Sequence, residues 1–566
     1  MVIRRRTVRF VLFARAGLRS LRILIGCVAP ALWSLGGCAS WHAADADREV
    51  HAVLAEYEQR ELGNRAEQIR QPTQAPETPT SGPSSEASTQ LAVSTDDNSE
   101  PNGAVDAVEP LLINLPAALL TAFTSSRDYI DRKEALYLSG LGFTLTRYNF
   151  GPILNSTISY LWDDQVNASG GDSLSATLGG RQILPTGGNL SISGTVTGSR
   201  GDDPDLFTPP DPAEYSYSST LQLNLRQPLL RGFGYAISHE ALTQGQRNLI
   251  YALRSFELFR QDFCIRVTDA FYRLVSQKKQ LANDEQNYED ALFDREKTEA
   301  LRQVDRVRED DVFLARRREI EAEDALLVAR TNYDLAVDDF KILLGLPTST
   351  EIEIPDREPD FQPVRIESRS AVEVSLHNRL DLHTLRDRVE DAERQVRIAR
   401  NRLLPDLDLD VGWSLNNIPS KPYDPTPERW SASVGATLEA PLDRKAERNA
   451  YRSSLIGLQQ ARRDVERNTD EIERDILDQL RQLRQVEKRI ILQRDQIVQE
   501  QKAVEVMNIR RESGDVNTRD LLDARRGLTN AQNALINLKV QHYVARLRLQ
   551  RNLGILFIDE EGQWRE

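Results

Sequence analysis

Residues 246–344 contain neither glycine nor proline, and their larger apolar side chains recur at helical spacing. One heptad position holds Leu253, Val267, Leu274, Leu281 and Tyr288, and a companion position holds Phe256, Phe263, Ala270 and Ala291 but turns polar at Gln277 and Asp284. Apolar residues three and four apart on one seam predict a coiled coil. A single helix over this stretch would be about 150 Å long, so we predict two antiparallel helices that meet at a polar tip near 303–311. The first arm, over 236–302, would be about 100 Å long.

Two other segments, 152–228 and 405–441, alternate between apolar and polar residues and therefore predict strands. Leu221, Leu223 and Leu225 lie on one face of the first segment, and Val434 and Leu438 lie on one face of the second. Such strands fit either a transmembrane barrel or a soluble sandwich, and the export signal described below favours the barrel. We expect four strands from the first segment and two from the second. Because fewer than eight strands cannot close a barrel of the usual size, several chains must build it together.

The chain contains an internal repeat. Asp128 precedes Pro152 by 24 residues and Asp381 precedes Pro405 by 24, and each proline opens a β segment. After each β segment a long helical arm leads to a polar tip, and the return helix ends at Gly345 or Gly554. We therefore predict an α+β fold made of duplicated antiparallel helical hairpins and strands. The predicted units are a first repeat over 111–347, a connector over 348–365, a second repeat over 366–558 with its tip near 511–520, and a C-terminal tail over 559–566.

The N-terminus has the pattern of an export signal. Residues 1–22 carry seven arginines and no acid, and an apolar run follows that is too short to span a bilayer. Leu35-Gly36-Gly37-Cys38 resembles a lipoprotein cleavage site, which implies a signal peptide over 1–37 and a covalent lipid on Cys38. An ordinary signal peptide with a chance cysteine is the alternative. We expect a lipidated helical segment over 38–70 and a disordered linker over 71–110, which is rich in Pro, Ser and Thr.

Composition narrows the function. Removal of the seven signal arginines takes the net charge from −14 to −21, and a strongly acidic surface disfavours nucleic acid. In the exported chain Cys264 is the only free thiol, because Cys27 lies in the signal and Cys38 would carry the lipid, so we expect no internal disulfide. Gly232-Phe233-Gly234 lacks the third glycine of a dinucleotide-binding turn, and the six histidines do not form a metal-binding pattern. We therefore expect no enzyme activity, no metal and no cofactor other than the lipid.

The run from Arg510 to Ala524, RRESGDVNTRDLLDA, resembles the second periplasmic tip of TolC-type outer-membrane efflux and secretion channels. Gln227–Gly234, which leaves the first β segment, also resembles that family, and the resemblance covers roughly 111–558. It implies a homotrimer with a shared barrel in the outer membrane and a helical tunnel through the periplasm. It also implies two partners, a periplasmic adaptor and an inner-membrane transporter. Ala39, directly after the lipidated cysteine, favours the outer membrane by the same analogy.

The resemblance also assigns candidate site residues at the tips. Asp520 and Asp523 would contribute three copies each to a ring of carboxylates that narrows the entrance and attracts cations. The alternative is that they are ordinary solvated acids near a helix N-terminus. Asp311, Arg511 and Gly514 would make contacts between hairpins. The chain departs from the family at Asp305, often Gly, at Val516, an Arg in some members, and at Arg511, often Tyr. We hypothesise that Arg511 pairs with Asp311 of the other hairpin.

These observations predict a passive trimeric exit duct of a tripartite efflux pump or type I secretion system, gated at its periplasmic tips. The duct would be lipid-anchored in the outer membrane, would span it, and would extend into the periplasm. The alternative is a non-porous coiled-coil lipoprotein of the cell envelope. The sequence does not identify the cargo.

Overall fold

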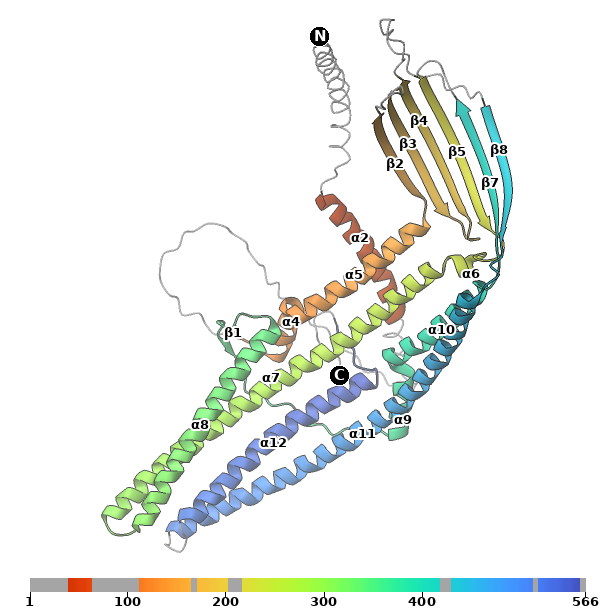
Figure 1. Ribbon diagram of the computed structural model, residues 1–566. Helices are drawn as coiled ribbons and strands as arrows, with labels where there is room; N and C mark the ends of the chain where they lie inside the picture. Colours follow the sequence, from red (N-terminus) through yellow and green to blue (C-terminus); the bar gives the residue numbers. More distant parts are fainter. Residues whose placement is uncertain are drawn as a thin grey trace, which may run out of the picture.

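The computed structural model describes residues 39–63, 111–163, 171–201, 216–417, 429–512 and 518–559. Two helical hairpins extend from a curved sheet and end in adjacent tips (Figure 1). The first hairpin consists of α7 (Glu240–Gln303) and α8 (Glu309–Leu344), and the second of α11 (Lys445–Glu512) and α12 (Thr518–Asn552). The 64 residues of α7 give it a length of about 96 Å. The predicted long antiparallel hairpins are therefore present.

The two halves of the chain repeat the same order of elements. α4 (Leu115–Ser125) and α5 (Arg127–Phe150) precede the first strands, and α9 (Ser368–Asn378) and α10 (Leu380–Asn401) precede the second set. A short helix, α6 (Tyr235–Ser238), leads into α7. In the connector, β6 (Ile352–Glu353) pairs in parallel with β1 (Leu111–Leu112). The N-terminal helix α2 (Ala39–Glu58) continues into a π-helical turn, η1 (Gln59–Gly63), and α2 lies against α5.

Six antiparallel strands form one sheet, in the order β2-β3-β4-β5-β7-β8. They are β2 (Ile153–Asp163), β3 (Gly171–Ile183), β4 (Asn189–Gly201), β5 (Ser216–Pro228), β7 (Asp406–Asn417) and β8 (Arg429–Glu439). The two repeats meet where β5 pairs with β7, with Leu223 opposite Trp413. The first β segment supplies four of these strands and the second supplies two, as expected.

The glycines that end α8 and α12 explain two landmarks of the repeat. Gly345 has φ of 80° and Gly554 has φ of 71°, a left-handed conformation that favours glycine. A Cβ on Gly345 would lie 2.0 Å from the carbonyl oxygen of Ser125, and one on Gly554 would lie 2.8 Å from Cβ of Asn378. Each glycine therefore allows a return helix to end against the C-terminus of the first helix of its own repeat.

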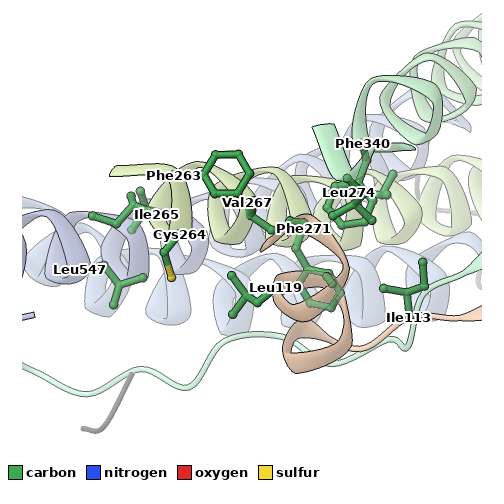
Figure 2. Close-up of a cluster of buried hydrophobic side chains, with 14 of the residues drawn as sticks. Ile113, Leu119, Phe263, Cys264, Ile265, Val267, Phe271, Leu274, Phe340 and Leu547 are labelled. Carbon is green, nitrogen blue, oxygen red and sulfur yellow. The ribbon is translucent and has the colours of Figure 1, made fainter. Parts of the chain in front are cut away.

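The largest apolar core lies midway along the hairpins, where α4, α7, α8 and α12 meet the connector (Figure 2). Phe263, Leu274 and Phe340 are fully buried there. The heptad pattern of α7 predicts this burial for Phe263 and Leu274. Cys264 is buried in the same core, and burial raises the pKa of its thiol to about 12. A thiol of this kind packs as a small apolar group rather than reacting. Among the helices that the structure describes, none combines the length and the apolar character needed to cross a membrane.

Candidate functional site: the helical tips and the seam between hairpins

The tip of the first hairpin turns without a glycine. α7 ends at Gln303 and α8 begins at Glu309. Asp305 adopts φ of 55°, a conformation that Asp tolerates better than most residues. Its carboxylate accepts a hydrogen bond of 2.8 Å from Nη1 of Arg302. The first tip is therefore a left-handed turn at an aspartate, and a local ion pair stabilises it.

Asp311 lies in the first turn of α8, where its Oδ2 accepts a hydrogen bond of 3.3 Å from the backbone N–H of Arg308. A carboxylate at a helix N-terminus satisfies an unpaired amide and interacts favourably with the helix dipole. Gly514 and the side chain of Arg511 lie outside the described residues. The pairing of Arg511 with Asp311 therefore stays a prediction, and the structure gives Asp311 a local capping role.

Asp520 and Asp523 both lie in the first two turns of α12 with exposed side chains, while Leu521 between them is fully buried. Leu521 thus fixes the rotation of the helix so that both carboxylates face outward. Asp523 also acts on Arg318 of the first hairpin. Burial and the neighbouring Arg526 lower the pKa of Arg318, and Glu321 and Asp523 oppose that effect. Both acids are therefore exposed on one helix, and Asp523 acts on a charge of the other hairpin; their place at a constriction stays a prediction.

A line of polar contacts, which we call the polar seam, joins α12 to the first hairpin above the tips. It consists of Ser276–Asn537 at 2.9 Å, Asn283–Asn533 at 2.5 Å, Arg525 with Asp290 at 3.3 Å and with Asp294 at 3.2 Å, and Arg526–Glu321 at 3.1 Å. Three of its members on α7 are seven residues apart, namely Ser276, Asn283 and Asp290. They therefore lie along one face of the helix. Polar pairs hold two helices with less free energy than packed apolar side chains, because water competes for them when they separate.

The sequence contained a partial signal for the polar seam. The companion heptad position turns polar at Gln277 and Asp284, each next to a seam residue on α7. Asp284 is half-buried, and this burial raises the pKa of its carboxyl. Nothing in the sequence identified Arg525 and Arg526 as the partners, because their contacts depend on how the two hairpins lie side by side.

The connector is held to both hairpins by charged contacts. Glu358 accepts hydrogen bonds of 2.7 Å from Nζ of Lys279 on α7 and 2.6 Å from Nζ of Lys539 on α12. Burial alone would raise the pKa of Glu358, but the two lysines outweigh it and lower the pKa below its usual 4.5. The backbone N–H of Val364 donates a hydrogen bond of 2.8 Å to Oε1 of Glu487 on α11. These contacts tie the hairpins together at mid-length, and the polar seam continues from this level toward the tips.

Comparison with known proteins supports a channel. Residues 371–555 match the family model described as outer membrane efflux protein. The fold matches the outer-membrane channel OprN (TM-score 0.59, 16% identity, 78% of this chain and 89% of that one). It also matches VceC of Vibrio cholerae (TM-score 0.59, 18% identity, 78% of this chain and 96% of that one). A third match is CmeC of Campylobacter jejuni (TM-score 0.58, 13% identity, 78% of this chain and 85% of that one). No curated protein matched the sequence.

These matches confirm the resemblance drawn from the tip and strand-exit motifs. The solved structures also confirm the fold class, and the family match over the second repeat agrees with the prediction of an efflux channel. At these identities the solved structures establish the fold alone, and the family match covers the second repeat. Both the family and the structural neighbours are channels and not enzymes.

Proposed function

We propose that this chain is one subunit of a passive trimeric exit duct. The match of residues 371–555 to the outer membrane efflux protein model and the fold shared with outer-membrane channels support the proposal. One observation carries the proposal: a single chain joins two hairpins of about 100 Å to a six-stranded sheet. Among the described residues, its edge strands β2 and β8 each pair on one side only. An isolated sheet of this kind exposes two rows of backbone amides and carbonyls. Pairing with further copies satisfies both rows and closes a barrel.

Exposed apolar stripes on the helices support the assembly of several copies. On α8 the stripe comprises Phe313, Ile320, Leu327, Leu335 and Ile342, and on α11 it comprises Ile491, Leu492, Val498, Val506 and Ile509. Large apolar patches on a soluble surface mark interaction sites, and steps of seven and eight residues keep the α8 stripe on one face. We expect the α8 stripe of one copy to pack on the α11 stripe of the next, which makes a closed ring of hairpins.

The tips would face an adaptor in the periplasm, and an inner-membrane transporter would supply the energy. The polar seam suits this role, because an adaptor that binds the tips can replace its hydrogen bonds without exposing an apolar core. The hydrogen bonds of Glu358 to Lys279 and Lys539 would hold the two hairpins together at mid-length while the tips separate. We place the constriction at Asp520 and Asp523, where six carboxylates around the axis would attract cations and narrow the entrance.

The Arg511–Asp311 pair would hold neighbouring hairpins at the closed tip. An Arg511→Ala variant should then increase leakage through the closed channel. If its conductance and leakage equal those of the unchanged protein, the pair has no such role.

A lipid on Cys38 would anchor the chain next to α2, which packs on the first repeat. Val53 and Tyr57 of α2 are buried with Phe143 of α5 and Leu253 of α7. Because α2 begins at Ala39, the acyl chains would enter the membrane directly beside the tunnel wall.

Single-channel recording on the purified, lipidated trimer in planar bilayers tests the proposal. A duct conducts ions in steps, and its conductance rises when the tips open. A non-porous envelope coiled coil of the same size produces no steps, and that result would overturn the proposed function.

A further inference from the structure

The first repeat carries 40 more residues between its two prolines than the second, and the structure shows where that extra length goes. It forms the hairpin of β3 and β4, inserted between β2 and β5. β3 pairs with β2 over the full length of β2, and β4 pairs with β5 from Asn189 to Ser199. The insertion is therefore part of the barrel wall rather than a loop or a plug.

The two edges of the sheet are built to join each other. All five pairings within the sheet are antiparallel, so β2 and β8 run in opposite directions. When copies are placed side by side around an axis, β8 of one copy meets β2 of the next in the antiparallel sense. The edge strands are equally long, with 11 residues each, so neither leaves a long unpaired overhang.

The faces of the edge strands also match. Leu154, Ile158 and Trp162 of β2 point to the same side as Trp430 and Val434 of β8, as the register across the sheet requires, and all five are exposed. The opposite face carries hydroxyl groups, including a Ser414–Ser431 hydrogen bond of 2.7 Å. A second copy therefore continues both the lipid-facing and the water-facing surface without a break.

We infer that three chains close a barrel of eighteen strands and that the β3–β4 hairpin widens the exit. This inference rests on the proposed trimer. Without the hairpin each chain would supply four strands, and the barrel would have twelve. Because barrel diameter grows roughly in proportion to strand number, the hairpin increases the diameter about 1.5-fold and the cross-section about 2.2-fold.

The added wall is polar and rich in hydroxyl groups on its inner side. Thr177 of β3 and Thr195 of β4 share a hydrogen bond of 3.0 Å, and Ser175 pairs with Ser159 of β2 at 2.6 Å. A wide exit lined by hydroxyl groups suits bulky hydrophilic solutes and discriminates weakly by charge. Selection by size then lies at the helical tips and not at the outer membrane.

The strand number can be counted directly by electron cryo-microscopy of the intact, detergent-purified protein. Eighteen strands in a trimer support the inference, and twelve strands, or a barrel from which β3 and β4 are excluded, overturn it. This count does not depend on conductance, so it decides the inference even if the protein proves not to conduct.

Deletion of residues 171–201 tests the widening. It removes β3, its turn and β4, and leaves β2 antiparallel to β5. Polyethylene glycols of graded size, added on the extracellular side in planar bilayers, report the widest polymer that enters the barrel. We expect the limiting polymer diameter to fall by about one third, while a Ser193→Ala control keeps the original limit. A conducting deletion variant with an unchanged limit contradicts the widening and leaves the proposed duct intact, whereas an intact protein without conductance contradicts the duct.

Discussion

The ion pair between Arg525 of α12 and Asp294 of α7 provides the sharpest test of the polar seam. The Asp294 side chain is 4% exposed and lies 3.2 Å from Nη1 of Arg525, which is 26% exposed. Arg525→Met keeps most of the aliphatic stem but removes the charge. Loss of a hydrogen bond to a charged group costs about 1.5–3 kcal/mol. Because Arg525 is partly exposed, we expect its replacement to cost a value in the lower half of that range, about 2 kcal/mol. Separation of the hairpins should then become about 30-fold more favourable.

Arg526→Met is the matched control. Arg526 pairs with Glu321 at 3.1 Å, but the two side chains are 51% and 46% exposed. Exposed ion pairs contribute about 0–1 kcal/mol because water screens them. In planar bilayers, Arg525→Met should raise the open fraction of the purified trimer strongly, and Arg526→Met should change it little.

Equal effects of the two substitutions would refute the reasoning, because burial would then not matter. A double-mutant cycle adds a second check. Asp294→Asn combined with Arg525→Met should cost less than the sum of the single changes, since both remove the same interaction. Additive effects would mean that the two residues are not coupled.

Four further predictions concern other parts of the molecule. Asp520→Asn with Asp523→Asn should reduce the cation preference of the channel, and an unchanged reversal potential in a KCl gradient would exclude the carboxylate ring. Leu327→Glu should place a charge in the α8 stripe and dissociate the trimer, measured by sedimentation with helix content as the control; a stable trimer would remove that stripe from the interface. Glu358→Gln should destabilise the protein at pH 7 by about 1–3 kcal/mol. The folded pKa of Glu358 lies below 4.5, so its stabilisation is present above pH 4.5 and is lost as the pH falls through the folded pKa. The difference in thermal unfolding temperature between the two proteins should therefore vanish in acid, and a difference that persists there would contradict this role. Cys38→Ala should abolish the lipid mass shift in mass spectrometry, and retention of that shift would place the lipid elsewhere.

Much of the fold could be predicted because its signals are local. The recurrence of Leu253, Val267 and Leu274 follows from one helix having a single buried face, and alternation over Leu221, Leu223 and Leu225 follows from a strand having two different faces. The turn at Asp305 was recognised as a departure from glycine, but its left-handed conformation became clear only in the structure.

The candidate site was predicted less completely. Asp520 and Asp523 are both exposed near the start of α12, and their place at a constriction stays a prediction. Arg525, Asp290 and Asp294 were missed. They are far apart in the sequence, and an ion pair between helices leaves no periodic pattern that assigns one charge to another.

The sequence by itself determined the duplication, the length of the hairpins, the place of the first tip and the two-faced strands, since each depends on residues within one or two turns or on a regular spacing. Only the tertiary structure decided that β5 joins β7 and that β3 and β4 enter the same sheet. It also decided that the hairpins are tied at Glu358 and meet along a polar seam. These features depend on pairing between distant segments, where many charged and polar partners are chemically equivalent and only the packing of the whole chain selects one.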